Sequence, residues 1–259
     1  MNPPLGGLFF KSMDIRQYLD STYLKTAAQA SLSEAENRVV AKAVIAEAIE
    51  QGFKLVMVRP DMVPMAKEMV ADANSKLGVG TVIDFPLGSG TLKAKLAEAR
   101  EAIANGADDL DFVINYTGFK NGAVNDVKRE VFECTGLGLE NGKIVKWIIE
   151  VAALNEHEIV QLSALVKNVV LSHFNEEDYN KVFVKSSTGF YRAQDGKPNG
   201  ATMETIKLMV ENAWPLHVKA AGGVRTYDEA IQMILLGVKR IGTSSAKAIA
   251  GGGDAKAGY

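Results

Sequence analysis

The sequence predicts a single α/β domain folded as a closed (β/α)8 barrel with a flexible C-terminal tail. Eight short apolar stretches alternate with segments of helical periodicity, which is typical of parallel strands joined by helices. The strands are apolar almost throughout, as expected when both faces of a sheet are buried. Eight strand–helix units in a chain of 259 residues also match the usual size of such a barrel.

An open, doubly wound sheet is the alternative fold. It is disfavoured because no Gly-x-Gly-x-x-Gly motif follows the first expected strand and because eight strands favour closure. Segments rich in glycine and proline lie at the ends of strands, as loops do, so no linker divides the chain. We therefore expect one barrel domain over residues 1–250 and a mobile tail over residues 251–259, whose composition does not favour regular structure.

The expected elements alternate along the whole chain. The expected strands are residues 18–21, 53–58, 79–84, 109–114, 144–150, 181–187, 215–221 and 240–244. The expected helices are residues 31–51, 61–76, 91–105, 124–137, 155–170, 202–212 and 226–237. Capping-box patterns at Ser31-Leu-Ser-Glu34 and Thr226-Tyr-Asp-Glu229 mark two helix starts, and Gly52 ends the first long helix.

Composition narrows the function classes. A net charge of -2 gives no bulk attraction to nucleic acid or to an anionic membrane, so any phosphate recognition must be local. The single cysteine, Cys134, excludes an intrachain disulfide framework, and no apolar run is long enough to span a membrane. The N-terminus does not resemble a secretory signal. We expect a cytoplasmic protein with a small-molecule substrate and without a nucleic-acid or membrane partner, and we consider a homodimer.

No metal site or cofactor is expected. The three histidines have no metal-ligand spacing with Cys134, which we expect to pack in the interior. Trp147 and Trp214 are also expected to be packing residues.

Two lysines lie late in apolar strands, where barrels place their catalytic groups. Lys185 interrupts the apolar, β-prone residues 181–190, and Lys219 lies in a similar strand further on. Each lysine is followed four residues later by a glycine, Gly189 and Gly223 respectively. Because an ammonium group among Val and Phe is costly unless it is used, this repeated pattern predicts a functional pair.

Acidic residues in other strands complete the candidate site. Asp111 lies inside the fourth strand, Asp20 belongs to the first, and Glu150 closes the fifth. Asp109 has the same strand parity as Asp111 but lies nearer the strand start, so we assign it to structure.

Two lysines and an aspartate suit an amine that must be neutral to attack a carbonyl. A free lysine has a pKa of about 10.4, and burial beside a second ammonium can lower the pKa to the order of 7. Lys185 is then the nucleophile, Lys219 the perturbing cation and Asp111 the group that moves protons. The alternative is a buried Lys–Asp ion pair that only stabilises the barrel.

Small residues after strands six to eight predict a phosphate pocket built from backbone N–H groups. The candidate residues are Gly189, Gly222, Gly223, Gly242, Ser244 and Ser245. Arg225 adds a cation nearby. For any one of these glycines an ordinary turn remains the alternative, and the three neighbouring clusters together favour phosphate.

Six motifs carry a resemblance to a known family. They are LDSTYLK at 19–25, DFPLG at 84–88, GADDLDFVIN at 106–115, WIIE at 147–150, VKSSTGF at 184–190 and VKAAGGVRT at 218–226. With them the chain resembles the deoxyribose-phosphate aldolases, class I Schiff-base enzymes on a (β/α)8 barrel, over nearly its whole length.

The resemblance implies an activity and residue roles. The family's reaction is the reversible cleavage of 2-deoxy-D-ribose 5-phosphate to D-glyceraldehyde 3-phosphate and acetaldehyde. Lys185 would form the Schiff base, Lys219 would tune it, and Asp111 would work in proton transfer. Asp20 resembles an aspartate that lies near the second lysine, and the phosphate would contact the six small residues named above.

The tail enters through the same resemblance. Members of the family end comparably, with a terminal tyrosine thought to enter the site and assist proton transfer. By similarity, Tyr259 would close over the bound imine as a transient lid bearing a phenol.

The chain departs from the family pattern at four positions expected to border the pocket. Ser21, Met57, Asp84 and Val151 stand where many members have other residues. Residues 191–200 also form a longer excursion than in some members. These departures bear on substrate range and rate more than on reaction type.

Two other hypotheses stay open. One is another Schiff-base barrel enzyme, a related aldolase or transaldolase acting on a different sugar phosphate. The other is a non-catalytic barrel that binds a sugar phosphate.

Overall fold

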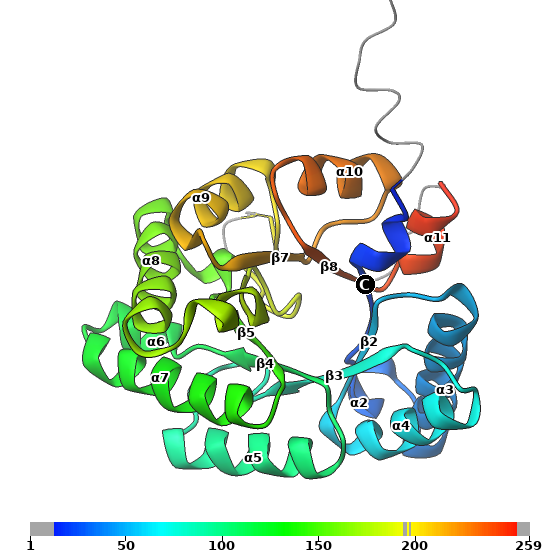
Figure 1. Ribbon diagram of the computed structural model, residues 1–259. Helices are drawn as coiled ribbons and strands as arrows, with labels where there is room; N and C mark the ends of the chain where they lie inside the picture. Colours follow the sequence, from blue (N-terminus) through cyan, green and yellow to red (C-terminus); the bar gives the residue numbers. More distant parts are fainter. Residues whose placement is uncertain (1–12, 194–195, 197, 253–259) are drawn as a thin grey trace, which may run out of the picture.

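The computed structural model describes residues 13–193, 196 and 198–252, which form a closed barrel (Figure 1). Eight parallel strands pair in chain order, and the last pairs with the first. The strands are β1 Leu19–Tyr23, β2 Leu55–Val58, β3 Gly78–Ile83, β4 Asp109–Val113, β5 Ile144–Ile148, β6 Val182–Lys185, β7 His217–Ala221 and β8 Arg240–Thr243. The predicted fold class is confirmed. Residues 253–259 of the expected tail lie outside the described part of the chain.

Helices surround the strands as an outer layer (Figure 1). They are α2 Ala27–Ala30, α3 Glu34–Gln51, α4 Val63–Asp72, α5 Leu92–Ala104, α6 Tyr116–Lys120, α7 Val124–Glu140, α8 Glu156–His173, α9 Met203–Ala213, α10 Tyr227–Leu235 and α11 Ala246–Ala250. Short 3-10 helices are η2 Ile15–Tyr18, η3 Pro60–Met62, η4 Val151–Ala153 and η5 Glu176–Lys181. No helix in the described residues is both long and apolar enough to cross a membrane.

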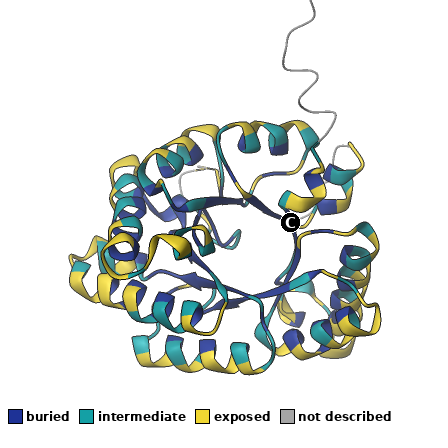
Figure 2. Cartoon of the chain, viewed as in Figure 1, coloured by how far each residue is buried: buried dark blue, intermediate teal, exposed yellow. Residues whose placement is uncertain are grey.

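Burial follows this two-layer arrangement (Figure 2). The strands are buried almost throughout, and the helices turn their buried side toward the barrel and their exposed side outward. In α3, for example, the buried residues Ala41, Ile45 and Ala48 recur at helical spacing. The main core therefore lies between the outer face of the strands and the inner face of the helices.

Strand register brings the charged residues of the sequence analysis together. Lys185 on β6 pairs with Lys219 on β7, and Asp111 on β4 pairs with Lys146 on β5. Side chains of paired residues in parallel strands point to the same face of the sheet. The four side chains share the interior of the barrel, and the fold thereby converts positions far apart in the chain into one site.

The start of α3 differs from the prediction. Its capping box begins at Ser33, whose side chain accepts from the backbone N–H of Glu36, and not at Ser31. Ser31 instead ends α2, a short helix the sequence analysis did not expect, in a left-handed conformation with φ 55°. The predicted cap at Thr226 and the end of α3 at Gly52 are confirmed.

The two tryptophans have different environments. Trp147 is fully buried, lies with its ring centroid 5.1 Å from that of Phe112, and donates to Thr135 Oγ1 at 3.0 Å. Trp214, at the end of α9, is 74% exposed, so its prediction as a packing residue is wrong. Trp214 is the C-cap residue of α9, where the backbone has left the helical conformation with φ -53° and ψ 132°. Cys134 is buried as expected.

Candidate active site

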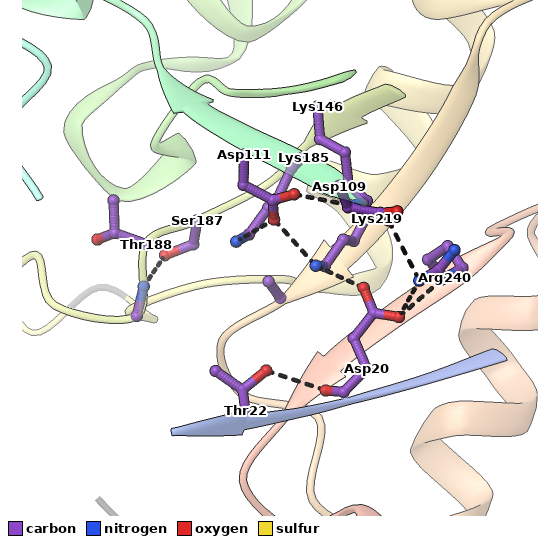
Figure 3. A network of polar contacts seen from close by, with 12 residues as sticks. Asp20, Thr22, Asp109, Asp111, Lys146, Lys185, Ser187, Thr188, Lys219 and Arg240 are labelled. Atoms are coloured by element: carbon purple, nitrogen blue, oxygen red, sulfur yellow. Dashed lines mark hydrogen bonds and ion pairs between the residues drawn. The ribbon is translucent and has the colours of Figure 1, made fainter. Parts of the chain in front are cut away.

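Seven charged side chains gather inside the barrel (Figure 3). They are Asp20 on β1, Asp109 and Asp111 on β4, Lys146 on β5, Lys185 on β6, Lys219 on β7 and Arg240 on β8. Each is at most 6% exposed. Buried charges are costly unless they are paired, so a network of this size indicates a functional site or a strong structural constraint.

Asp111 lies at the centre of the network. Its Oδ2 accepts hydrogen bonds from Lys185 Nζ at 2.8 Å and from Lys219 Nζ at 3.0 Å. Its Oδ1 accepts from Lys146 Nζ at 2.7 Å. The structure thus brings together the three residues that the sequence analysis assigned to the chemistry, with one carboxylate oxygen joining both lysines.

Asp20 and Asp109 extend the network away from Lys185. Asp20 Oδ2 lies 2.6 Å from Lys219 Nζ, and its Oδ1 accepts from Arg240 Nε at 2.7 Å. Asp109 Oδ2 accepts from Lys146 Nζ at 2.6 Å and from Arg240 at 3.4 Å. Asp20 lies beside the second lysine, where the resemblance put it. Among the described residues, Asp109 forms ion pairs with Lys146 and Arg240 and none with Lys185.

Sequence reasoning missed Lys146 and Arg240. Lys146 interrupts the apolar stretch Ile144–Ile148 in the same way that Lys185 interrupts its own strand, so the same argument could have found it. Arg240 is the first residue of β8, a position at which a charge is usually solvated, and nothing in the local pattern reveals that it is buried.

The charges explain why one amine differs from the others. The network contains four cations and three carboxylates, so one positive charge is in excess. Burial lowers the pKa of Lys185 from 10.5 to about 8, with Asp111 opposing the shift and Lys219 adding to it. Burial also acts on Lys146, but Asp109 and Asp111 more than offset it and raise its pKa. Lys185 is therefore the amine from which loss of a proton balances the network.

Asp111 is held in its ionised form. Burial alone would raise the pKa of Asp111, but Lys146, Lys185 and Lys219 hold it well below the ordinary value. An ionised carboxylate 2.8 Å from Lys185 Nζ is placed to accept a proton from that amine or to return one to it.

A cavity of about 330 Å³ lies over this network. Lys185 is the member of the charged network that lines the cavity, and Lys219, Asp111 and Asp20 do not line it. The six residues predicted to bind phosphate all line the cavity: Gly189, Gly222, Gly223, Gly242, Ser244 and Ser245. Arg225 lines it as well. The cavity thus places one amine of lowered pKa at the base of a wall rich in backbone groups.

A family model describes this chain. The model of the DeoC/LacD family aldolases matches residues 17–249, which include all eight strands. The chain belongs to this aldolase family. It is therefore an aldolase, a carbon–carbon lyase.

Relatives of the aldolase agree with one another in name. It is 40% identical to a deoxyribose-phosphate aldolase from Thermococcus gammatolerans over 90% of this chain and 93% of the relative. Among solved structures, it resembles QR15, an aldolase, with 33% identity and a TM-score of 0.75 over 92% of this chain and 95% of that one. A deoxyribose phosphate aldolase from Aeropyrum pernix, described as a unique tetramer, has 25% identity and a TM-score of 0.73 over 92% of this chain and 89% of that one.

The glycines of the aldolase serve different local needs. Gly222 and Gly223 have φ values of 75° and 88°, which favour glycine, and they turn the chain after β7. The N–H groups of Gly223 and Ser244 have no acceptor among the described residues. Gly242 lies within β8, where an added Cβ would stand 3.0 Å from Lys219 Cε, so this glycine makes room for the second lysine.

The four departures from the family pattern are not among the residues that line the cavity, and their effect on the substrate stays a prediction. Met57 packs in a small apolar cluster with Leu55 and Val82. Asp84 Oδ2 lies 3.3 Å from Nζ of the buried Lys95. Ser21 and Val151 are buried at 4% exposure.

The described end of the 191–200 excursion forms part of the cavity wall. Pro198, Asn199 and Gly200 line it. Gly200 packs directly against Gly222, since an added Cβ would lie 2.5 Å from the carbonyl oxygen of Gly222. No group of three or more His, Cys, Asp or Glu side chains that could hold a metal ion occurs in the described chain.

Proposed function

We propose that this aldolase reversibly cleaves 2-deoxy-D-ribose 5-phosphate to D-glyceraldehyde 3-phosphate and acetaldehyde through a Schiff base on Lys185. The observation that carries the proposal is the position of Lys185, which lines the cavity while its Nζ donates to Asp111 Oδ2 at 2.8 Å. Its pKa of about 8 leaves an appreciable fraction of neutral amine near neutral pH. The names of the relatives support the substrate.

The chemistry follows from the neutral amine. Lys185 Nζ attacks the C1 aldehyde of the open-chain sugar, and loss of water from the carbinolamine gives the imine. Removal of the proton of the C3 hydroxyl breaks the C2–C3 bond, releases glyceraldehyde 3-phosphate and leaves the enamine of acetaldehyde. Protonation of the enamine carbon and hydrolysis release acetaldehyde and the free amine. Asp111 accepts and returns protons at Lys185, and Lys219 supplies the neighbouring positive charge.

The substrate phosphate would lie at the far wall of the cavity. Backbone N–H groups of the loops after β6, β7 and β8 suit an anion, and the open N–H groups of Gly223 and Ser244 are the best candidates. Arg225 supplies a cation at the same wall. Gly242 would contribute mainly by admitting Lys219.

Four expectations remain proposals beside the reaction. Tyr259 lies outside the described residues, and its part in proton transfer at the enamine rests on the resemblance alone. The division into a barrel over residues 1–250 and a tail is kept as proposed. We also propose a cytoplasmic protein, supported by its single buried cysteine, and a homodimer, for which the tetrameric Aeropyrum pernix relative shows that assembly occurs in this family.

The reaction is tested by product analysis. Purified protein with 2-deoxyribose 5-phosphate should yield acetaldehyde and glyceraldehyde 3-phosphate in equal amounts, measured by coupled reduction of each product. Asp111→Asn keeps the shape of the side chain but cannot accept the proton, so it should lower kcat. Because Lys146, Lys185 and Lys219 lose their shared carboxylate, it should also lower the free energy of unfolding by roughly 3–5 kcal/mol. Turnover of a different sugar phosphate in place of this one would indicate another Schiff-base enzyme, and absence of any turnover would favour a binding protein.

A further inference from the structure

Glu150 is a buried carboxylate that the reaction above does not use. It lies two residues beyond β5, is fully buried, and makes no ion pair with a described residue. Its backbone has φ 49° and ψ 70°, a left-handed conformation that is uncommon outside glycine. Strain and a buried charge are both costly, and they concentrate at functional sites.

The carboxylate receives three hydrogen bonds from the loop that follows Lys185. Ser187 Oγ donates to Oε1 at 2.9 Å, and the backbone N–H of Thr188 donates to Oε2 at 3.1 Å. The hydroxyl of Thr188 also donates to Oε2. One side chain on the β5 exit therefore binds two consecutive residues on the β6 exit.

These contacts determine the next two residues of the loop. A hydroxyl has one proton, so donation to Glu150 leaves the lone pairs of Ser187 and Thr188 free to accept. Ser187 Oγ accepts from the N–H of Gly189 at 2.9 Å, and Thr188 Oγ1 accepts from the N–H of Phe190 at 3.0 Å. The carboxylate thus orients the hydroxyls, and the hydroxyls orient the backbone up to Phe190.

The same loop supports a second wall of the cavity. Asn199 Nδ2 donates to the carbonyl oxygen of Gly189 at 3.3 Å, and the Asn199 carbonyl lies 3.1 Å from Ser187 Oγ. Ala201, two residues on, donates its N–H to the carbonyl oxygens of Ala221 and Gly222. The contacts of Glu150 therefore reach, step by step, the loops after β6 and β7 that line the cavity.

We propose that Glu150 is a positioning residue, whose carboxyl group fixes the Ser187–Phe190 loop so that the cavity wall fits the phosphate of the substrate. The inference rests on the proposed function, because it concerns the phosphate end of that substrate. An amide would keep one acceptor oxygen for Thr188, but it would present an NH2 group in place of the oxygen that accepts from Ser187 Oγ, so that hydrogen bond would be lost or reversed. Burial raises the pKa of Glu150, while the hydrogen bonds from Thr188 and Ser187 oppose the shift.

The first test compares two substrates in Glu150→Gln. KM for 2-deoxyribose 5-phosphate should rise by about tenfold or more, the effect of losing one or two charge-assisted hydrogen bonds. KM for unphosphorylated 2-deoxyribose should change much less, because Lys185 and Asp111 are untouched. Thr188→Val removes the hydroxyl, and with it one contact to Glu150 and the acceptor for the N–H of Phe190, but keeps the backbone contact of residue 188 to Glu150. It should show the same split to a smaller degree, so the inference stays testable if Glu150→Gln folds poorly.

Glu130→Gln is the matched control. Glu130 on α7 is also buried, accepts from a lysine, Lys95 Nζ at 2.7 Å, and from the N–H of Asn115 at 3.2 Å, and its pKa is also raised by burial. It does not line the cavity. This variant should lose stability without changing the ratio of the two KM values.

Amide hydrogen exchange provides a readout that does not depend on activity. In Glu150→Gln, peptides covering residues 186–193 should exchange faster, while peptides from β2 and β3 keep the wild-type rate. Inorganic phosphate should slow exchange at these residues in the wild type and do so less in the variant. If the wild type fails to cleave 2-deoxyribose 5-phosphate, the proposed function fails, and the exchange data still report on Glu150.

The outcomes separate clearly. A KM split together with local loosening supports the positioning role. Equal changes in both KM values, or exchange that rises throughout the barrel as in a simple loss of stability, would overturn it. An unchanged KM for the phosphorylated substrate in both Glu150→Gln and Thr188→Val would overturn it as well.

Discussion

At the scale of single residues, Lys185 lowers the stability of the protein that uses it. The fall of its pKa from 10.5 to about 8 corresponds to about 3 kcal/mol against the protonated folded form. At pH 7 the amine is mainly protonated in both the folded and the unfolded state, so nearly the whole cost is present. Between pH 8 and pH 10.5 the unfolded chain binds more protons than the folded protein, and stability therefore rises with pH.

Lys185→Met should accordingly be more stable than the wild type at pH 7. The replacement keeps the length of the side chain and removes the charge that is in excess, so the free energy of unfolding should rise by up to about 3 kcal/mol. The advantage should shrink as the pH is raised from 8 toward 10. Chemical denaturation of both proteins across this range measures it, and a variant that is less stable at pH 7 would contradict the charge argument.

Lys219 is expected to act on Lys185 through its charge. Its Nζ lies 3.0 Å from the same carboxylate oxygen, and its charge lowers the pKa of Lys185. Lys219→Met should therefore move the ascending limb of the kcat/KM profile above pH 8, because the neighbouring cation no longer opposes protonation. An unmoved limb with normal turnover would leave Lys219 as a structural residue.

At the scale of elements, the start of α3 provides a direct check on local structure. Ser33→Ala removes the side-chain acceptor for the N–H of Glu36 and should lower the free energy of unfolding by about 1 kcal/mol. Ser31→Ala is the control, because Ser31 already holds a left-handed conformation as a residue with a Cβ, and it should change stability much less. Thermal unfolding compares the two. A larger loss at Ser31 would contradict the cap assignment.

Loops and strand ends were the elements least accessible from sequence. The positions of strands and helices could be predicted from the periodicity of apolar residues, because the same residues form the core of the folded protein. The two-residue error at Ser31 arose because Ser31 ends the short helix α2, so the next helix takes Ser33 as its N-cap. Glu150 was expected to close β5, but the strand ends at Ile148. Glu150 then adopts a left-handed conformation, which a sequence does not reveal when the residue is not glycine.

At the scale of the whole molecule, Arg240 links the last strand of the barrel to the first. It lies on β8 and bonds Asp20 on β1 and Asp109 on β4, so the ion pairs span nearly the full length of the chain. Arg240→Met leaves Asp20 with Lys219 and Asp109 with Lys146, and should cost roughly 3–5 kcal/mol, as loss of one buried partner does.

The half-exposed pair Lys67–Asp108 is the control for this prediction. Its atoms lie 3.0 Å apart, yet Lys67→Met should cost less than about 1 kcal/mol because solvent screens the pair. Urea denaturation with a constant slope for all three proteins measures both changes. If both variants lost a similar free energy of unfolding, the ion pairs of Arg240 inside the barrel would not stabilise the closed barrel.

Sequence reasoning found the centre of the site but not its support. Lys185, Lys219 and Asp111 interrupt apolar strands, so the cost of burying a charge is enough to identify them from the sequence. Lys146 carries the same signal and could have been included. Arg240 could not, because only closure of the barrel buries it. Gly242 was assigned to phosphate, and its contact with Lys219 depends on register between β7 and β8, which a sequence does not reveal.

The identity of the covalent residue tests the account most directly. The protein is incubated with acetaldehyde and borohydride, digested, and its modified peptide is sequenced by mass spectrometry. In the wild type we expect a single reduced two-carbon adduct, on Lys185. Lys185→Met should form no adduct, and Lys219→Met should form the adduct only at higher pH. An adduct on Lys219 or Lys146, or an equal distribution over surface lysines, would contradict the assignment of Lys185 as the nucleophile.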